Sequence, residues 1–146
     1  METDMKKKIR KFLEDNNFLP YSKWNHFELV HGNPEYKKEV EKEIRRNVGT
    51  KNGLYIYEKN GKLLYIGKGK PLFVRIKSHY MESYTNVLGD RTGVWFKFFS
   101  SHKGKVRIYW KELEDEKTRE IIEEMLTYVL NPKFETFKKS IRARKL

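Results

Sequence analysis

The sequence predicts an α+β fold, with a small antiparallel sheet of three or four strands flanked by helices. Two observations support this prediction. The β-prone runs 54–57 and 62–66 are separated by Glu-Lys-Asn-Gly, and Asn-Gly between apolar runs is a strong hairpin signal. Apolar residues also recur at helical spacing before and after this hairpin, over 5–13, 36–44 and 121–129. At 146 residues, the chain is long enough for one modest core.

The first fifty residues are expected to form a helical extension. Residues 1–17 place Met5, Ile9 and Leu13 at helical spacing, and lysines and arginines cover the other faces. These cations form either a solvated helix face or an arm that contacts a polyanion. Residues 18–32 are a mixed aromatic segment to which the sequence assigns no definite shape.

A second helix is predicted between Asn33 and Gly49. Asn33 and the following proline suit a helix cap and a first helical residue, and Gly49 suits a helix end. Tyr36, Val40 and Ile44 make an apolar stripe at four-residue spacing. A short joint, 50–52, then leads to the hairpin.

The stretch from Gly53 to Tyr80 is a hairpin that leads into a helix. Pro71 suits a helix start, and Leu72, Ile76 and Tyr80 follow at helical spacing. The stretch has no acidic residue between Gly61 and Tyr80. It carries five cations, which create a local field suited to anions. These cations are Lys62, Lys68, Lys70, Arg75 and Lys77.

Two further strands and one helix are expected after a polar loop at 85–93. The β-prone run Val94–Phe99 predicts an added strand, and Val106–Trp110 predicts another. Residues 113–130 predict a helix with a continuous apolar stripe and acidic residues in its first turn. Asn131-Pro132 ends this helix.

Composition excludes several classes of protein. Charged residues make up 36% of the chain and aromatic residues 14%, which favours a folded domain with a heavily solvated surface. A net charge of +12 favours a polyanionic partner. The chain has no cysteine, so disulfides, thiolate catalysis and thiolate zinc sites are excluded. No apolar run resembles a membrane span or a signal peptide, and a cytoplasmic protein is the simplest expectation.

The hairpin carries two short motifs, Gly53–Tyr55 and Tyr65–Gly67, with their tyrosines ten residues apart. They resemble the two motifs that name the GIY-YIG nuclease superfamily. The family has an arginine on the helix after the second motif and a histidine or tyrosine one turn later, where Arg75 and His79 stand. Each motif alone is weak because strands are rich in tyrosine, but the combination in register is specific. The resemblance covers roughly residues 53–135.

The resemblance implies a role for each of these residues. Tyr55 would be the general base, and Tyr65 would help to hold the water or the phosphate. Arg75 would stabilise charge at phosphorus, and His79 would relay a proton or bind the scissile phosphate. Lys68, which follows the second motif, would contact phosphate or lower the pKa of Tyr55, since a tyrosine base requires a nearby cation. The alternative from the residues alone is packing for the tyrosines and surface charge for the cations.

A metal-binding carboxylate is expected on the helix at 113–130. Glu120, Glu123 and Glu124 all lie there, and helical geometry places Glu123 and Glu124 equally on opposite sides of the apolar stripe. In the excision-repair branch of the family, the catalytic glutamate lies nine residues before a proline, in a pattern ending Pro-x-aromatic-Asn. Glu123 lies nine residues before Pro132, and Phe134 matches the aromatic position. The resemblance therefore implies Glu123 as the ligand of one hard divalent ion, Mg²⁺ or Mn²⁺.

One position departs from the family pattern. Glu135 stands where the final asparagine is expected, so it is either a candidate second metal ligand or a sign of a partly degenerate site. Asn131 is near in sequence but out of register. The expected organisation is therefore a helical extension over 1–50, a GIY-YIG-like module over 51–137 and a basic tail over 138–146.

The function expected from the resemblance is a metal-dependent endonuclease acting on nucleic acid, with DNA favoured over RNA. Two alternatives remain open: a non-catalytic nucleic-acid-binding module with the same fold, and a basic adaptor that binds protein or RNA through its N-terminal aromatic residues. Neither a membrane nor a nucleotide cofactor is expected, and the sequence does not indicate an oligomeric state. The basic tail would track a phosphate backbone or remain solvated. Its cations are Lys138, Lys139, Arg142, Arg144 and Lys145.

Overall fold

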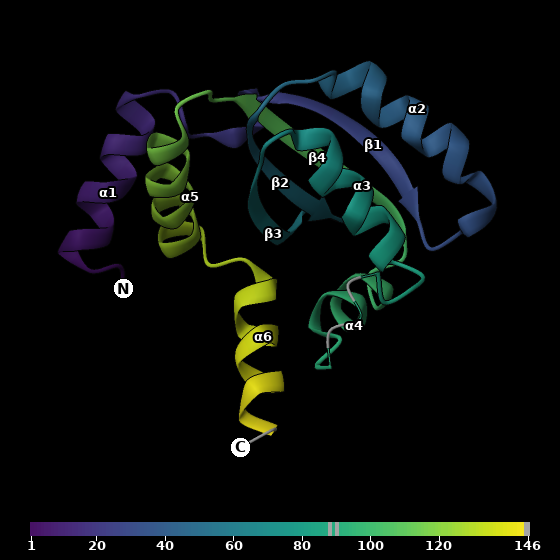
Figure 1. The fold of residues 1–146 in the computed structure, drawn as a ribbon. Coiled ribbons are helices and arrows are strands. Elements are labelled where there is room, and N and C mark those ends of the chain that lie inside the picture. Colours follow the sequence, from purple (N-terminus) through teal and green to yellow (C-terminus); the bar gives the residue numbers. More distant parts are fainter. Residues whose placement is uncertain (88, 90, 145–146) are drawn as a thin grey trace.

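A computed structural model describes residues 1–87, 89 and 91–144, with the side chains of 142–144 excepted. Helices and strands make up most of this part of the chain (Figure 1). The order of the elements is α1 (Asp4–Asp15), η1 (Tyr21–Lys23), β1 (Asn25–His31), η2 (Pro34–Tyr36), α2 (Lys37–Val48), β2 (Gly53–Lys59), β3 (Lys62–Gly69), α3 (Leu72–Glu82), α4 (Val94–Ser100), β4 (Gly104–Glu112), α5 (Glu116–Leu130) and α6 (Lys133–Arg144).

The four strands form one antiparallel sheet in the order β1-β4-β2-β3. The predicted hairpin is confirmed as β2 and β3, with Asn60 and Gly61 both at positive φ in its turn. Its register places Tyr55 opposite Gly67, and on its other side Tyr55 lies opposite Trp110 of β4. β3 is therefore an edge strand that carries the second motif, while the first motif lies on the interior strand β2.

Helices cover both faces of the sheet (Figure 1). α1 and α5 lie side by side over one face, where Leu54 and Ile56 of β2 pack against Ile122 and Leu126. The other face carries Tyr55, which belongs to a second core with residues from α2, α3 and α4. Alternation along β2 thus sends successive residues into two separate cores. The first motif tyrosine faces α3, which is the helix that carries Arg75 and His79.

The other predicted helices are present, with recognisable ends. Thr3 caps α1 by accepting a hydrogen bond from the amide of Lys6. Gly49 ends α2 at a φ of 56°. Asp115, expected within the first turn, instead caps α5, which begins at Glu116, and Asn131 ends the helix at a φ of 47°.

The run Val94–Phe99 was predicted as a strand, and that prediction is wrong: it forms helix α4. Apolar residues occupy both the odd-numbered and the even-numbered positions of this run. The two-residue period of a strand and the period of a helix therefore fit it about equally. The tertiary contacts decide between them. Phe98 and Phe99 are adjacent in sequence and are both buried in the same core, the one that contains Tyr55, while Lys97 beside them is exposed. Adjacent residues of a strand would point to opposite faces.

The fourth strand comes instead from the N-terminal half. β1 lies in the segment that the sequence left without a defined shape, and it pairs with β4 along its length. Phe27, Leu29 and His31 point into the core, with exposed residues between them. The first fifty residues therefore contribute one strand to the sheet in addition to helices α1 and α2.

The chain continues as helix α6 after Pro132, and this helix includes residues 138–144 of the segment that was expected to be a basic tail. In α6, Phe134 and Ile141 are buried and Phe137 packs against the core that contains Tyr55. Of the predicted tail cations, the side chains of Arg142 and Arg144, and all of Lys145, lie outside the described residues. Within the described part of the chain, no helix combines the length and the apolar character that crossing a bilayer requires.

Candidate active site

Two glycines explain how the two motifs fit together. Gly53 lies so close to the backbone of Lys111 on β4 that an added Cβ would overlap the carbonyl oxygen. Gly67 faces Tyr55 across the hairpin, and an added Cβ there would lie 2.5 Å from the phenol oxygen. Both sites exclude any larger side chain unless something moves. The space above Gly67 is what allows the Tyr55 ring to lie over β3 and reach α3.

Tyr55 and His79 meet in the core between the sheet and α3. The Tyr55 hydroxyl oxygen lies 2.6 Å from Nε2 of His79, and both residues are fully buried. On its other side, His79 Nδ1 lies 2.8 Å from Oε1 of Glu82, which is also buried. Three titratable groups are therefore joined in a line. Glu82 is a residue that the sequence analysis missed.

Arg75 is the cation that acts on Tyr55. Burial raises the pKa of Tyr55 to about 12, while the charge of Arg75 and its hydrogen bond to the phenol oppose this increase. The expectation that a cation lowers the pKa of Tyr55 below its usual value is therefore not met, because burial outweighs the cation. At neutral pH, Tyr55 keeps its proton. Burial and the charge of Arg75 hold the pKa of His79 well below its usual value, so His79 is neutral.

Glu123 and Glu124 differ in their surroundings. Glu123 is half-buried, whereas Glu124 is exposed. Burial raises the pKa of Glu123, and Glu124 and Glu135 raise it further through their negative charges, while Lys68 and Lys138 lower it. Glu123 also interacts electrostatically with Tyr55. The structure thus brings Glu123, rather than Glu124, towards the two motifs.

Lys68 and Glu135 both interact electrostatically with this carboxylate. Lys68 is exposed, and its Nζ lies 3.9 Å from a carboxylate oxygen of Glu120. Glu135 forms an ion pair with Lys138 at 2.8 Å, one helical turn further along α6. α5 and α6 therefore supply the acidic side of the site, and the loop after β3 supplies a cation.

The acidic side chains present fit one hard divalent ion. No cluster of three or more histidine or acidic side chains suited to a metal occurs among the described residues. Mg²⁺ commonly needs fewer protein ligands, since one or two carboxylates, several waters and substrate phosphates complete its shell. Glu123 is a donor of this kind. It is half-buried, and the negative charges of Glu124 and Glu135 add to the negative potential around it. Glu135 is near enough to act electrostatically on Glu123 and remains a candidate second ligand.

An aromatic wall, Tyr65, Trp95, Phe99 and Phe134, surrounds His79. Phe99 stacks on the imidazole with ring centres 4.5 Å apart, and Trp95 stacks at 5.7 Å. Tyr65 meets the imidazole edge-on at 4.9 Å and stacks on Phe134 at 5.1 Å. These contacts fix the imidazole plane and keep water away from it. Trp95 and Phe99 lie on α4, whose helical spacing the β-prone run concealed.

The structure thus brings Tyr55, Tyr65, Arg75 and His79 together, with Glu123 and Lys68 at the margin. Tyr57, interpreted as a packing residue, is fully buried and lies near Ile76. Lys77, interpreted as surface charge, pairs with Glu41 of α2 at 3.3 Å. The Tyr57 ring packs edge-on against Tyr55 at 5.9 Å and His79 at 5.6 Å, as a packing residue would, whereas Lys77 points its charge at α2.

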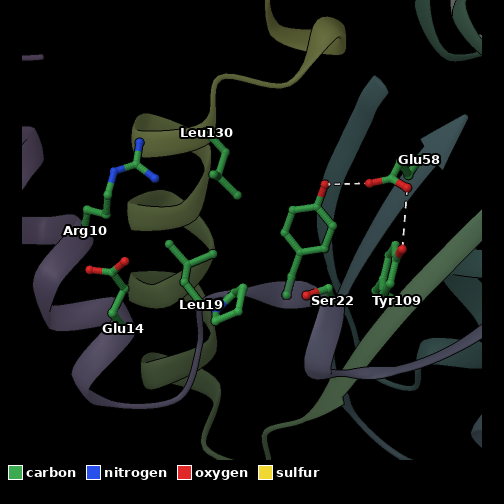
Figure 2. Close-up of a pocket in the computed structure, with 9 residues that line it drawn as sticks. Arg10, Glu14, Leu19, Ser22, Glu58, Tyr109 and Leu130 are labelled. Atoms are coloured by element: carbon green, nitrogen blue, oxygen red, sulfur yellow. Dashed lines mark hydrogen bonds between the residues drawn. The ribbon is translucent and has the colours of Figure 1, made fainter. Parts of the chain in front are cut away.

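A separate hollow of about 410 Å³ lies between α1, the 19–22 segment and the sheet (Figure 2). Glu58 lies at one side, where its carboxylate accepts hydrogen bonds from the hydroxyls of Tyr21 at 2.7 Å and Tyr109 at 3.4 Å. Arg10 of α1 lines the other side. None of the predicted site residues lines this hollow. The motif residues are therefore gathered at the β3 edge and not in this hollow.

Comparisons with known proteins give a likeness in structure only. No protein-family model matches the chain, and no curated protein matches it. Three similar solved structures are all of the GIY-YIG N-terminal endonuclease domain of UvrC from Thermotoga maritima. Two are point mutants bound to a catalytic divalent cation: both cover 66% of this chain and 94% of the other at a TM-score of 0.47, with 24% and 23% identity.

The third is the same domain bound to magnesium, at 24% identity and a TM-score of 0.45, covering 64% of this chain and 96% of the other. A likeness at this level concerns the arrangement of the backbone and does not extend to activity. What the site of this protein does has to be judged from its own side chains.

Proposed function

We propose that this protein is a metal-dependent endonuclease of the GIY-YIG type that hydrolyses phosphodiester bonds in nucleic acid, with DNA as the favoured substrate. The observation that carries the proposal is the group at the β3 edge. There, a tyrosine hydroxyl lies 2.6 Å from a neutral histidine, next to a half-exposed arginine and a half-buried carboxylate. This group contains a proton acceptor, a permanent cation for phosphate and a ligand for a hard metal ion.

Tyr55 and His79 act together on the attacking water. Because Tyr55 keeps its proton at neutral pH, it serves as a base only by passing that proton on as it takes another. A proton moves from water to the Tyr55 oxygen while the Tyr55 proton moves to Nε2 of His79. Water then attacks phosphorus as hydroxide, and one proton rests on the imidazole. Tyr55 is buried in the free protein. The attacking water would therefore have to enter from the side on which Arg75 is half exposed.

Arg75 binds the scissile phosphate and stabilises the charge that develops on it, since a guanidinium stays protonated and can bind two oxygens. Glu123, with Glu135 as a candidate partner, holds the divalent ion. When bound, Mg²⁺ or Mn²⁺ supplies positive charge to the phosphoryl oxygens and the leaving 3′ oxygen. Lys68 contacts a flanking phosphate. Tyr65 packs against His79 and helps to keep Tyr55 in place.

A non-catalytic nucleic-acid-binding module is the second candidate. Two observations favour it: Glu135, in the place of the family asparagine, is engaged with Lys138, and the Tyr55 ring is fully buried. Both candidates predict binding, and only the first predicts cleavage. Nicking of a supercoiled plasmid with Mg²⁺ or Mn²⁺, compared with EDTA, separates them. Cleavage products from mixed DNA and RNA substrates then identify the substrate class.

The sharpest test of the proposal compares Glu123→Gln with Glu124→Gln. The two residues are neighbours on α5, but only Glu123 is half-buried near the motifs. Loss of the metal ligand should lower the cleavage rate by roughly 10²-fold or more, because charge stabilisation at the phosphate is lost. Glu124→Gln, in a solvated side chain, should leave the rate almost unchanged. The measurement is a titration of cleavage rate against Mg²⁺ concentration.

Glu135→Asn completes this set. If Glu135 is a second ligand, the change weakens the dependence on Mg²⁺; if it is a tolerated substitute, activity is kept or rises. Nucleic-acid binding in EDTA should survive in all three variants, which reports that the fold and the basic surface are intact. Retained activity in Glu123→Gln together with loss in Glu124→Gln would show that the assignment on α5 is wrong by one residue.

A further inference from the structure

We propose that Glu82 is a positioning residue of this site: its carboxylate holds His79 with the proton on Nδ1, so that Nε2 is free to accept a proton from Tyr55. The proposal deepens the proposed function and rests on it for the cleavage step. Its structural part concerns only the proton on His79, and it can be tested without any cleavage.

The location of Glu82 is unfavourable for a residue that only supports the fold. Its side chain is almost fully buried, which disfavours the ionised carboxylate. It is the last residue of α3, where the helix dipole disfavours negative charge. Its Oε2 atom is buried and has no hydrogen-bond partner among the described residues. Burial, the helix C-terminus and the unpaired Oε2 all make a carboxylate unfavourable at position 82. Its presence there requires an explanation beyond packing.

The contact with His79 provides that explanation. Above its pKa, which burial raises to about 7, Glu82 is ionised and can only accept hydrogen bonds, so the 2.8 Å contact between Oε1 and Nδ1 then requires the proton to lie on Nδ1. A neutral imidazole then has a lone pair on Nε2, and the 2.6 Å contact there requires the Tyr55 hydroxyl to donate. The reverse tautomer would place a hydrogen on Nε2, directed at the phenol oxygen, and the Tyr55 proton would then have to point away from His79.

Glu82 also determines where the proton is stored. When Tyr55 passes its proton to Nε2, His79 becomes a cation inside an aromatic wall that offers no solvent. Arg75 nearby disfavours that cation. The Glu82 carboxylate, hydrogen-bonded to Nδ1, is the adjacent negative charge that compensates it. No bond other than those to the transferred protons is made or broken in this step, and the proton remains on His79 until the leaving oxygen or solvent takes it.

Two substitutions of Glu82 separate orientation from charge. Glu82→Leu removes the acceptor, so the His79 proton should move from Nδ1 to Nε2. Glu82→Gln retains an amide oxygen that can accept from Nδ1 but lacks the charge, so cleavage should fall by roughly 10²-fold even where the tautomer is kept. The proton on His79 is located by long-range ¹H–¹⁵N correlation NMR, at a pH above the pKa of Glu82, which burial raises to about 7.

A double-mutant cycle shows whether Glu82 acts through His79. In a His79→Gln background, Glu82→Gln should lower single-turnover cleavage no further, because the residue that it positions is already absent. Glu41→Gln is the matched control, since Glu41 pairs with Lys77 of the same helix but lies away from the site. That control should cleave at the wild-type rate. Thermal unfolding of each variant reports loss of stability separately from loss of rate.

Three outcomes overturn the proposal. They are a proton that stays on Nδ1 in Glu82→Leu, wild-type cleavage by Glu82→Gln, and additive losses in the double mutant, which would indicate a merely structural role. If the wild-type protein does not cleave nucleic acid at all, the proposed nuclease function fails by itself. The NMR measurement still decides whether Glu82 sets the His79 tautomer, because it requires no substrate.

Discussion

His31 is buried on β1 among Tyr57, Tyr80 and Phe99, and neither of its ring nitrogens has a hydrogen-bond partner among the described residues. Burial lowers its pKa to about 3, with smaller contributions from electrostatic interactions with His79 and Lys59. An imidazole in this position is stable only when neutral. Acid should therefore unfold the protein partly through this one residue.

The unfolded chain binds a proton at His31 near pH 6.5, whereas the folded chain binds it only near pH 3. Between these values the unfolded state is favoured as pH falls, by about 1.4 kcal/mol per pH unit. Glu82 acts in the opposite direction, since its pKa is raised to about 7 and its protonation favours the folded state. Comparing His31→Phe with the wild type isolates the His31 contribution. The variant should become relatively more stable as pH falls below 6.5, by urea unfolding across a pH series.

His26→Phe is the control for this series. His26 is exposed on the same strand, so the same substitution there should leave the pH dependence of unfolding unchanged. Parallel stability curves for the wild type and His31→Phe would contradict the assignment of acid sensitivity to His31.

At the scale of elements, α4 departs most from the sequence expectation. Its seven residues support the aromatic wall, because Phe99 stacks on His79 and Phe98 packs against Phe134. A strand here would have placed residues 96 and 98 on the same face. The helix separates them: Phe98 is almost fully buried, and Phe96 is half exposed.

Alanine substitutions at Phe96 and Phe98 test the helix directly. Phe98→Ala should lower the free energy of unfolding by about 3–5 kcal/mol, because it leaves a cavity among aromatic rings. Phe96→Ala should cost about 1 kcal/mol, since its ring keeps part of its exposure. Both are measured by denaturant unfolding under one set of conditions. Equal costs at the two positions would support the strand geometry instead.

The predictable parts of this fold are those whose signals are local. The hairpin turn at Asn60-Gly61 and the end of α2 at Gly49 depend on neighbouring residues, so the sequence contains their full description. β1 was missed because its partner β4 lies about eighty residues away, although the buried alternation of Phe27, Leu29 and His31 was visible.

The site divides in the same way. Tyr55, Arg75 and His79 were predicted from the spacing of motifs that resemble those of a known family, and Glu123 from its distance to Pro132. Glu82 was missed since a glutamate three residues after a histidine is ordinary on any helix. Only the burial of both side chains distinguishes this pair, and burial is a property of the folded molecule. The β-prone run Val94–Phe99 concealed the aromatic wall for the same reason.

At the scale of the whole molecule, charge is the dominant property. A net charge of +12 on 146 residues creates a positive potential over the surface, which suits a polyanionic partner. Binding through phosphates releases counterions, so affinity must fall as salt rises. This relation holds for both candidate functions and does not depend on catalysis.

Affinity for a short DNA duplex should fall by roughly 10³-fold between 50 and 200 mM salt if six or more phosphates are contacted. The measurement is fluorescence anisotropy in EDTA, so that cleavage does not interfere. A single strand and an RNA duplex of the same sequence provide the comparison. A flat salt dependence for all three ligands would rule out a basic surface that binds nucleic acid.

The pairing of β1 with β4 has a practical consequence for anyone shortening this protein. The motifs all lie after residue 52, so removing residues 1–52 would leave every motif residue in place. It would strip β4 of its neighbour from Asn25 to His31 and leave a row of open amides and carbonyls along the sheet. An exposed edge strand of this kind pairs with strands of other molecules, so the trimmed protein is expected to aggregate. The first fifty residues therefore protect the β4 edge of the sheet and cannot be removed without exposing it.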